Sequence, residues 1–477
     1  MKRIVPVALV GLLALASVRG PVATAAGPTL SMQQSEEIVA SYAHLTADFY
    51  KKVDRQAALE GARMSMLEFL KKHDVPNATL PQIHASDDDA SNAEALQHEV
   101  QTAVGSYAAK LKPLESLNGP TQLTYAAISG VLGSVKDRYT VFLSPKEYAA
   151  LNEGLDGSSF GGIGISYDID AKTKNLHVQN VILDGPSDKA GLQADDMITA
   201  VDGKSITSIL GTTTNADVQT KKISAALRGD PGTKVSVTIQ RDGKLLAPVT
   251  ITRAEIHEPS VFAKMLPNDI GYIQLAVFGQ STGQELDNAL KRLDSEGAKA
   301  YVLDLRRNGG GYLNAAIDVS SKFISSGPIV SVQSRSGVDT EYDAENDAIP
   351  PRPLAVLVDQ YTASASEITA GAIQDSGVGK IVGTKTFGKG VVQTIFPMRD
   401  GSAVKITTAR YFTPKGRDIN SVGIQPDIQS VLPKDTAGIR FRDPKSDPQL
   451  EAALSYIDGR IDVSTTTGAV PAPSQQR

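Results

Sequence analysis

The chain has 477 residues, of which 41% are hydrophobic, 21% charged and 5% aromatic, which is enough for about three domains with buried cores. Its 48 Lys and Arg residues face 53 Asp and Glu residues, and the net charge of −5 argues against a nucleic-acid-binding protein. The absence of Cys excludes disulfides, thiolate metal sites and a thiol nucleophile. With only six His, catalysis would depend mostly on hydroxyl, carboxylate, lysine and backbone groups.

The first 26 residues have the pattern of a secretory signal peptide. Lys2 and Arg3 precede an apolar run over residues 4–18, and small residues such as Ala23 and Ala25 close the segment. The run is shorter than the roughly twenty residues that a membrane span needs. We therefore expect an exported protein, periplasmic or otherwise extracytoplasmic; an uncleaved segment would instead anchor it to the membrane.

In the first half of the chain the predicted secondary structure changes from helices to short β-strands. Apolar periodicity predicts helices over residues 31–72, 93–117 and 121–135. The acidic triplet at 87–89 is predicted to be a solvated loop, because it lacks the glycine and distal glutamate of a calcium site. From residue 158 to about residue 253, short β runs alternate with glycine-rich turns, which predicts a compact β domain.

The second half of the chain alternates strands and helices, which predicts an α/β layer with crossover connections. The predicted strands cover residues 271–275, 300–305, 354–358, 380–383 and 391–396, and the predicted helices 282–295, 312–324 and 365–375. A short helix is expected over residues 449–457. The tail from residue 464 is rich in Thr, Ser and Pro and is predicted to be disordered.

A glycine-rich turn follows the strand predicted at 300–305. Residues 304–311 read Asp-Leu-Arg-Arg-Asn-Gly-Gly-Gly and lead into a helix. Glycines in this position let backbone N–H groups converge where the helix dipole is positive, which suits a developing oxyanion. Taken alone, an ordinary glycine-rich turn is the simpler interpretation.

A second motif, Thr-Ala-Ser-Ala-Ser-Glu-Ile at residues 362–368, joins a strand to a helix. This layout presents Ser364 at a helix N-terminus, as nucleophile elbows do, although the sequence is not a G-x-S-x-G match. Ser364 or Ser366, followed by Glu367, would also serve as a helix N-cap. For this segment alone the N-cap is the simpler interpretation.

The third motif, Gly-Thr-Lys-Thr-Phe-Gly-Lys-Gly-Val-Val-Gln at residues 383–393, approaches a phosphate-binding loop. We reject a nucleotide site because Gly390 replaces the required Ser or Thr, and because a strand rather than a helix follows. Lys389 then lies in a glycine-flanked, apolar segment. Burial disfavours an ammonium ion, so a lysine in this setting can act as a general base. No His neighbours these motifs in the sequence, which favours a Ser–Lys pair.

Together these segments closely resemble the carboxyl-terminal processing peptidases, also called tail-specific proteases, which are serine peptidases with an embedded PDZ domain. The similarity extends with interruptions from about residue 125 to 454. The spacing of 25 residues between Ser364 and Lys389 is also typical of the family. The resemblance implies an α/β multidomain fold: a crotonase/ClpP-like α/β protease core, an inserted PDZ β-domain and an N-terminal helical region.

The resemblance also implies roles for individual residues. Ser364 would be the nucleophile, Lys389 the general base and Gln393 the residue that orients the lysine, while the N–H groups of Gly310 and Ala365 would form the oxyanion hole. One departure is visible, since Gly309 stands where the family usually has proline. That change would loosen the turn, or let the hole form only when substrate binds.

Two further positions and one loop follow from the same resemblance. Asp375 lies where some members carry a functionally important acid, and a structural role for it is an equally good interpretation. Arg228 matches a position that, in the family, would couple the PDZ domain to the active site. The carboxylate-binding loop of the PDZ domain would be Phe160, Gly161, Gly162, Ile163, Gly164 and Ile165. In such domains a peptide adds as a strand, and backbone N–H groups hold its terminal carboxylate.

The expected domain order has six parts. They are a signal peptide at 1–26, a helical region at 27–120, a first part of the protease or cap region at 121–156, a PDZ domain at 157–253, the serine peptidase core at 254–440, and a C-terminal helix with a disordered tail at 441–477.

The predicted function is an exported serine endopeptidase that cleaves proteins with accessible C-terminal tails, without metal or other cofactor and without nucleic acid. The alternative is a non-catalytic PDZ adaptor or holdase on the same fold. A crotonase-like acyl-CoA enzyme would share the layered fold, but an export signal and a PDZ domain fit it poorly. Homo-oligomerisation and activation by a peptide or adaptor stay open.

Overall fold

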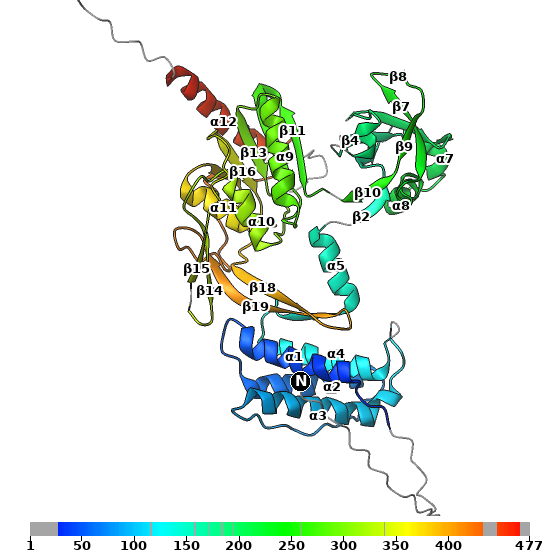
Figure 1. Cartoon of the computed structure of the whole chain (residues 1–477), viewed down its shortest axis with the longest axis vertical. Helices are drawn as coiled ribbons and strands as arrows, with labels where there is room; N and C mark the ends of the chain where they lie inside the picture. The colour runs from blue at the N-terminus through cyan, green and yellow to red at the C-terminus, as the bar shows by residue number, and fades with distance from the viewer. Residues whose placement is uncertain are drawn as a thin grey trace, which may run out of the picture. The chain divides into compact units, whose positions relative to one another are not determined.

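The computed structural model describes residues 27–114, 117–156, 159–170, 172–182, 185–193, 195–257, 259–337, 339–432 and 446–467 (Figure 1). The predicted signal peptide, the first two residues of the predicted PDZ domain and the last ten residues of the predicted tail lie outside this part. The chain divides into two compact units; residues 1–47 and 53–142 fall in the first, and the remainder in the second. No helix in the described ranges is long and apolar enough to cross a membrane.

Four helices make up the first unit: α1 (Met32–Asp48), α2 (Arg55–Lys72), α3 (Asp89–Tyr107) and α4 (Gly119–Gly133). The side chains of Asp54, Asp88 and Asn118 cap the N-termini of α2, α3 and α4 by accepting backbone N–H bonds. Helices α2 and α4 pack closely because Gly61 and Gly130 face each other. A Cβ built on Gly130 would lie 2.2 Å from the Gly61 carbonyl oxygen.

The β domain is part of the second unit and consists of an antiparallel sheet with three helices. Strands β3 (Ile165–Ile169), β4 (Leu176–Val181), β5 (Met197–Val201), β7 (Lys234–Arg241), β8 (Lys244–Leu245) and β9 (Val249–Thr252) belong to this sheet, with β6 (Lys204–Ser205) paired to β5. Helices α6 (Pro186–Lys189), α7 (Ile206–Leu210) and α8 (Ala216–Leu227) accompany it. The strands bury an apolar cluster that includes Val178, Ile198 and Val237.

A six-stranded sheet forms the centre of the α/β region in the second unit. Its order is β11 (Val261–Leu266), β12 (Ile270–Leu275), β13 (Ala300–Asp304), β16 (Leu354–Val358), β17 (Lys380–Gly383) and β20 (Ile428–Gln429). All neighbours from β12 to β20 are parallel, and β11 alone pairs antiparallel with β12. The carboxyl ends of β13, β16 and β17 therefore lie at one edge, which is where ligands bind in open α/β sheets.

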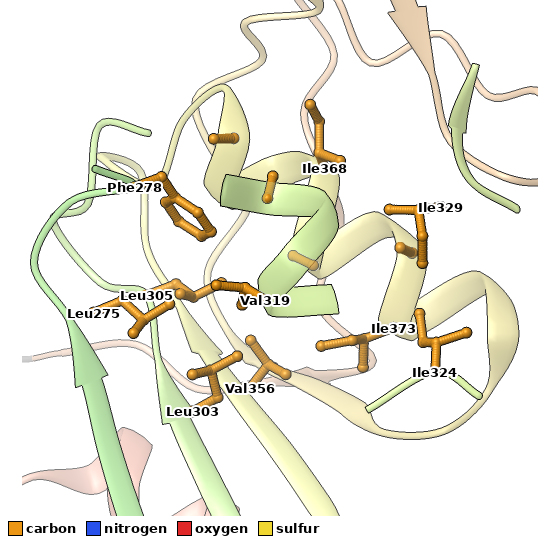
Figure 2. Close-up of a cluster of buried hydrophobic side chains, with 14 of the residues drawn as sticks. Leu275, Phe278, Leu303, Leu305, Val319, Ile324, Ile329, Val356, Ile368 and Ile373 are labelled. Carbon is orange, nitrogen blue, oxygen red and sulfur yellow. The ribbon is translucent and has the colours of Figure 1, made fainter. Parts of the chain in front are cut away.

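Helices cover both faces of this sheet. Side chains alternate between faces along a strand, so Leu303 and Val356 join one buried cluster while Val302 and Ala355 join the other. The first cluster includes residues of α9 (Thr282–Ser295), α10 (Leu313–Ser321) and α11 (Ala365–Ser376), and Figure 2 shows its side chains converging from strands and helices. The second includes Leu450 and other residues of α12 (Pro448–Thr467).

Further elements complete the described chain. An antiparallel sheet runs in the order β18 (Val391–Pro397), β19 (Ala403–Phe412), β14 (Pro328–Ser334) and β15 (Asp339–Asp343). Strand β2 (Ser159–Gly162) pairs with β10 (Ala254–His257) where the β domain is connected to the α/β region. The remaining elements are β1 (Val141–Leu143), α5 (Pro145–Asp156) and two short 3₁₀ turns, at Ala108–Lys110 and Pro267–Asp269.

The structure corrects several expectations. The helix predicted over residues 93–117 is α3, which ends at Tyr107 and is followed by a 3₁₀ turn. The acidic triplet predicted as a solvated loop includes Asp88, the N-cap of α3, and Asp89, its first residue.

The helical stretch predicted over residues 31–72 is two helices, because Asp54 begins α2 as an N-cap and residues 49–54 are not helical. The disordered tail predicted from residue 464 is helical as far as Thr467. Nearer its N-terminus α12 buries Leu450, Ala453 and Ile457 in the cluster that it shares with the sheet, and this packing stabilises the helix.

Candidate active site

Ser364 lies in a strained turn between β16 and α11. Its φ of 59° and ψ of −119° are unusual for a residue with a side chain, and such a conformation costs roughly 1–3 kcal/mol. The residue is partly exposed, whereas Ala365 and Ser366 beside it are buried. The strained turn at the carboxyl end of a parallel strand therefore directs a serine out of the core, as expected for a nucleophile elbow.

The Glu367 carboxylate connects this turn to the segment around Lys389. It is fully buried, and its Oε2 accepts the Ser364 N–H at 2.9 Å and the Lys389 N–H at 2.8 Å. Its Oε1 accepts the Gly388 N–H at 2.7 Å and the Thr386 hydroxyl. Four donors compensate the cost of burying this charge. Glu367 thus fixes the two predicted catalytic segments against each other.

Tyr411, on β19, provides a second link between the same segments. Its buried hydroxyl lies within hydrogen-bonding distance of the carbonyl oxygens of Ser364, at 3.1 Å, and of Lys389. Lys389 itself is half-buried and is followed by Gly390, on which a Cβ would lie 2.6 Å from the Asn420 nitrogen. The glycine therefore permits a close approach of two backbones beside the predicted base.

The glycine-rich turn lies directly against Ser364. Gly310 has a φ of 98°, and a Cβ on it would lie 2.8 Å from both the Ser364 Cβ and the Ala365 nitrogen. The N–H of Gly310 donates to the Asn308 Oδ1 at 2.8 Å. The Asn308 amide in turn donates to the Leu275 carbonyl at 2.9 Å. One of the two predicted oxyanion-hole donors is therefore engaged by a neighbouring side chain in this conformation.

Two other predicted residues of the core, Gln393 and Asp375, make contacts of their own. Gln393 is half-buried on β18, and its amide donates to the Val391 carbonyl at 3.3 Å. Asp375, near the end of α11, accepts the Lys415 N–H at 3.0 Å and forms an ion pair with Arg417 at 2.5 Å. These contacts give Asp375 a structural task, since they fix the loop that follows β19.

In the β domain, the predicted carboxylate-binding loop begins on β2 and ends on β3. Phe160, Gly161 and Gly162 belong to β2, Ile163 and Gly164 form the connection, and Ile165 begins β3. A Cβ on Gly161 would lie 2.0 Å from the Gly229 carbonyl oxygen. The exposed Arg228, which precedes Gly229, stacks its guanidinium 3.6 Å from the centre of the Phe160 ring. The structure thus brings Arg228 to the first residue of this loop.

The described residues contain no group of three or more His, Asp and Glu side chains placed to hold a metal ion. Sequence patterns did not indicate Tyr411 or the bond from Gly310 to Asn308, and they identified Glu367 only as a helix-capping residue. The Glu within the Ser-Ala-Ser-Glu segment was the one available signal. Residues 410–414 resemble the strand near the catalytic cleft of the carboxyl-terminal processing peptidases, but this resemblance assigned no role to Tyr411.

Comparison with known proteins places these segments in a family. Residues 269–430 match the model of peptidase family S41, and residues 161–250 match a PDZ domain model. The chain is 35% identical over 357 residues to a carboxyl-terminal-processing protease of Synechocystis sp., a match that covers 73% of this chain and 80% of the relative. It is 36% identical over 339 residues to the carboxy-terminal processing protease CtpA of Bacillus subtilis, covering 71% of this chain and 68% of the relative.

Among solved structures, a photosystem II D1 C-terminal processing protease aligns with 28% identity and a TM-score of 0.44, covering 86% of this chain and 96% of the other. The family predicted from the sequence motifs is confirmed by the sequence comparisons. The chain belongs to the carboxyl-terminal processing proteases of peptidase family S41, and it is a serine-type peptidase with a PDZ domain that acts on protein or peptide substrates.

Proposed function

We propose that this protein is an exported endopeptidase that cleaves proteins with accessible C-terminal tails by means of a Ser364–Lys389 dyad. The observation that carries the proposal is the buried Glu367 carboxylate, which accepts the backbone N–H groups of both residues. This shared acceptor holds the two segments in one arrangement, and the Tyr411 hydroxyl supports it from the other side. A nucleophile and its base need such fixed proximity.

In the proposed mechanism the Ser364 hydroxyl oxygen attacks the carbonyl carbon of the scissile peptide bond. Neutral Lys389 accepts the hydroxyl proton and then delivers it to the departing amine as the C–N bond breaks. Water hydrolyses the acyl-enzyme ester by the same route, with Lys389 as base, and Ser364 is regenerated. Gln393 orients the lysine amine from β18.

The oxyanion hole of this mechanism consists of the N–H groups of Gly310 and Ala365. The Gly310 N–H first exchanges its bond to the Asn308 Oδ1 for a bond to the substrate oxygen. Gly309, where the family usually has proline, gives the turn the freedom to make this exchange. The conformation described above then corresponds to a resting state that substrate completes.

Substrate selection is assigned to the PDZ domain, with residues 160–165 as the loop that receives the terminal carboxylate. Arg228, stacked on Phe160, is the residue proposed to couple peptide binding to the peptidase core. A peptide with a free C-terminus should compete with a protein substrate, whereas the same peptide with a C-terminal amide should compete much less.

We also propose a core fold, domain boundaries and an export route for the chain. The parallel sheet covered by helices on both faces is consistent with a crotonase/ClpP-like core at residues 254–440, preceded by a PDZ domain at 157–253 and the helical region at 27–120. Residues 1–26 are proposed to direct export and to be removed. A mature N-terminus near residue 27 in the secreted or periplasmic fraction would support this proposal, and a cytoplasmic full-length chain would reject it.

The dyad is tested with Ser364→Ala and Lys389→Ala, assayed on a protein substrate with an unstructured C-terminal tail. Each variant should lose cleavage while retaining the melting temperature of the parent chain. Lys385→Ala is the matched control, because Lys385 is exposed in the same segment and its removal should leave cleavage unchanged. Cleavage at the parent rate by either dyad variant would reject the assignment.

Membership in a family of serine-type peptidases weighs against the alternative of a non-catalytic PDZ adaptor, whose one support is the bond between the Gly310 N–H and the Asn308 Oδ1. In that case the hole would never open, and the chain would bind tails without cleaving them. Asn308→Ala discriminates between the two. It frees the Gly310 N–H and should leave some cleavage in an enzyme, but should create none in an adaptor.

A further inference from the structure

Behind the glycine-rich turn, a buried ion cluster connects two distant parts of the chain. Arg306 is 3% exposed and lies between Asp304, which is 1% exposed, and Asp447, which is fully buried. Its Nε donates to the Asp304 Oδ1 at 3.0 Å, and its Nη1 donates to the Asp447 Oδ1 at 2.9 Å. The Tyr272 hydroxyl donates to Asp304 from the neighbouring strand. Burial alone would lower the pKa of Arg306, but the two aspartates more than compensate and raise it, so the guanidinium stays charged.

Gln449 extends the cluster toward the segment that carries Lys389. Its Oε1 accepts from the Arg306 Nη1 at 3.2 Å, and its Nε2 donates to the Ser430 carbonyl at 2.9 Å. Ser430 donates its own N–H to the carbonyl of Gly383, the last residue of β17 and the first of the predicted base motif. One buried side chain thus touches Arg306 directly and is joined through Ser430 to the start of the other catalytic segment.

Asp447 is fixed independently by the helix that it begins. Its Oδ1 accepts the N–H groups of Gln449, at 3.2 Å, and Leu450, at 3.1 Å, in the manner of an N-cap. Leu450 is fully buried between α12 and the central sheet. The carboxylate that receives Arg306 is therefore set in place by helix packing rather than by the turn itself.

We propose that Asp447 and Gln449 are positioning residues for the catalytic centre, so that the N-terminal end of α12 is part of the catalytic apparatus. The inference rests on the proposed function, because it names the residues that hold the glycine-rich turn with Gly310 and the segment with Lys389 in their positions. Arg306 precedes Asn308 by two residues and Gly310 by four. A shift of its guanidinium is therefore transmitted to the donor that faces the scissile carbonyl.

The charges around Arg306 explain why removal of the Asp447 carboxylate should displace the glycine-rich turn. With Asp447 neutral, Arg306 loses the anionic partner that precedes α12 and keeps its bonds to Asp304, the last residue of the strand before the turn. The ion pair that joins the turn to the start of α12 is then gone. Rearrangement of Arg306 by about 1 Å would suffice to lower catalysis by about a hundredfold. Loss of Gln449 removes one hydrogen bond from the Arg306 guanidinium and one to the Ser430 carbonyl but no ion pair, so it should act in the same direction with a smaller effect.

The experiment compares Asp447→Asn, Gln449→Ala and the matched control Glu451→Gln in the full chain. Glu451→Gln removes the same charge from the first turn of the same helix at an exposed position, so its kcat should stay within about twofold. Asp447→Asn should lower kcat by about tenfold to a hundredfold with little change in KM, and Gln449→Ala by about threefold to tenfold. Hydrogen exchange of residues 306–312 should accelerate in both variants and stay unchanged in the control.

Three outcomes overturn the proposal. They are parent values of kcat in both variants, unchanged exchange at 306–312, or exchange that rises uniformly over the core as in global unfolding. If Asp447→Asn does not fold, Gln449→Ala, which leaves every charge in place, decides alone. The exchange measurement needs no activity. If Ser364 is never acylated, the proposed function is rejected, but hydrogen exchange still tests whether Asp447 and Gln449 position residues 306–312.

Discussion

The helical unit and the peptidase core bury carboxylates in opposite ways. In the core, Glu367 is fully buried and accepts four hydrogen bonds, and Asp304 and Asp447 enclose a buried arginine. In the helical unit, Glu99 is 1% exposed, and neither of its carboxylate oxygens has a hydrogen-bond partner among the described residues. Burial raises the pKa of Glu99 to about 7, with Arg63 opposing the shift.

The difference separates two uses of a buried acid. A carboxylate with four donors is held in one orientation and can position other groups, whereas one without donors is most stable when protonated. The core thus needs its charges for geometry. The helical unit tolerates an acid whose ionisation opposes folding near neutral pH.

The largest effect is expected when the core loses its central anion. In Glu367→Gln the amide keeps one acceptor oxygen and turns an NH₂ group toward donors that it cannot satisfy. Cleavage should fall by about a hundredfold or more, and the free energy of unfolding by about 2–4 kcal/mol. Steady-state kinetics and urea titration measure both quantities. The exposed Glu341 provides the control Glu341→Gln, and equal effects of the two substitutions would remove Glu367 from its positioning role.

The helical unit should be more sensitive to close packing than to charge. Gly130→Ala places a methyl group 2.2 Å from the Gly61 carbonyl oxygen and should destabilise the unit by about 1–3 kcal/mol by separating α2 from α4. Gly133→Ala is a matched control on the same helix, since nothing lies within 4 Å of its Cβ. Thermal unfolding should show a lower transition for Gly130→Ala only. Identical melting curves for the two variants would contradict close contact at this crossing.

The Glu99 contrast predicts a pH dependence of the opposite sign to that of an ordinary carboxylate. Its folded-state pKa of about 7 lies above the ordinary glutamate pKa of 4.5, so the folded state binds the extra proton between these values. Stability of the helical unit should therefore fall as pH rises from about 4.5 to about 7, and level off above. Glu99→Gln should abolish this slope and stabilise the unit by roughly 1–2 kcal/mol at pH 8.

Unfolding curves measured at several pH values check this expectation. Glu94→Gln, an exposed substitution on the same helix, should leave the slope intact. A slope that persists in Glu99→Gln would assign the titration to another group.

The smallest effect concerns the β domain, where the residue in question, Arg228, is exposed. Arg228→Gln removes the contact with the Phe160 ring and should cost about 0.5–1 kcal/mol of β-domain stability. If Arg228 also couples peptide binding to the core, activation by a free C-terminal peptide should weaken more than basal cleavage does. A variant with unchanged stability and unchanged peptide response would leave both roles without support.

Sequence patterns predicted the elements whose signals are local. The helix at 282–295 and the strands at 354–358 and 380–383 agree with α9, β16 and β17 to the residue. Apolar periodicity and capping residues suffice there because each element buries a simple face. The missed elements, such as α5, β14 and β15, have mixed patterns, and their pairing depends on partners far away in the chain.

The candidate site was predictable in part for the same reason. Ser364 and Lys389 lie in short motifs that are recognisable within a few residues. Tyr411 reaches them across the fold from β19, and Asp447 reaches the catalytic turn from more than 130 residues away along the chain. Only tertiary packing brings such groups together. The bond between Asn308 and Gly310 depends on one side-chain rotamer, which a sequence does not specify.

The most direct test of the account is covalent labelling of the nucleophile. The parent chain and Lys389→Ala are treated with a fluorophosphonate probe, and the modified residue is located by peptide mass spectrometry. The dyad predicts one dominant adduct, on Ser364, which forms at least about a hundredfold more slowly without Lys389. An unmodified Ser364 in the parent chain, or equal labelling in the two proteins, would contradict the central claim.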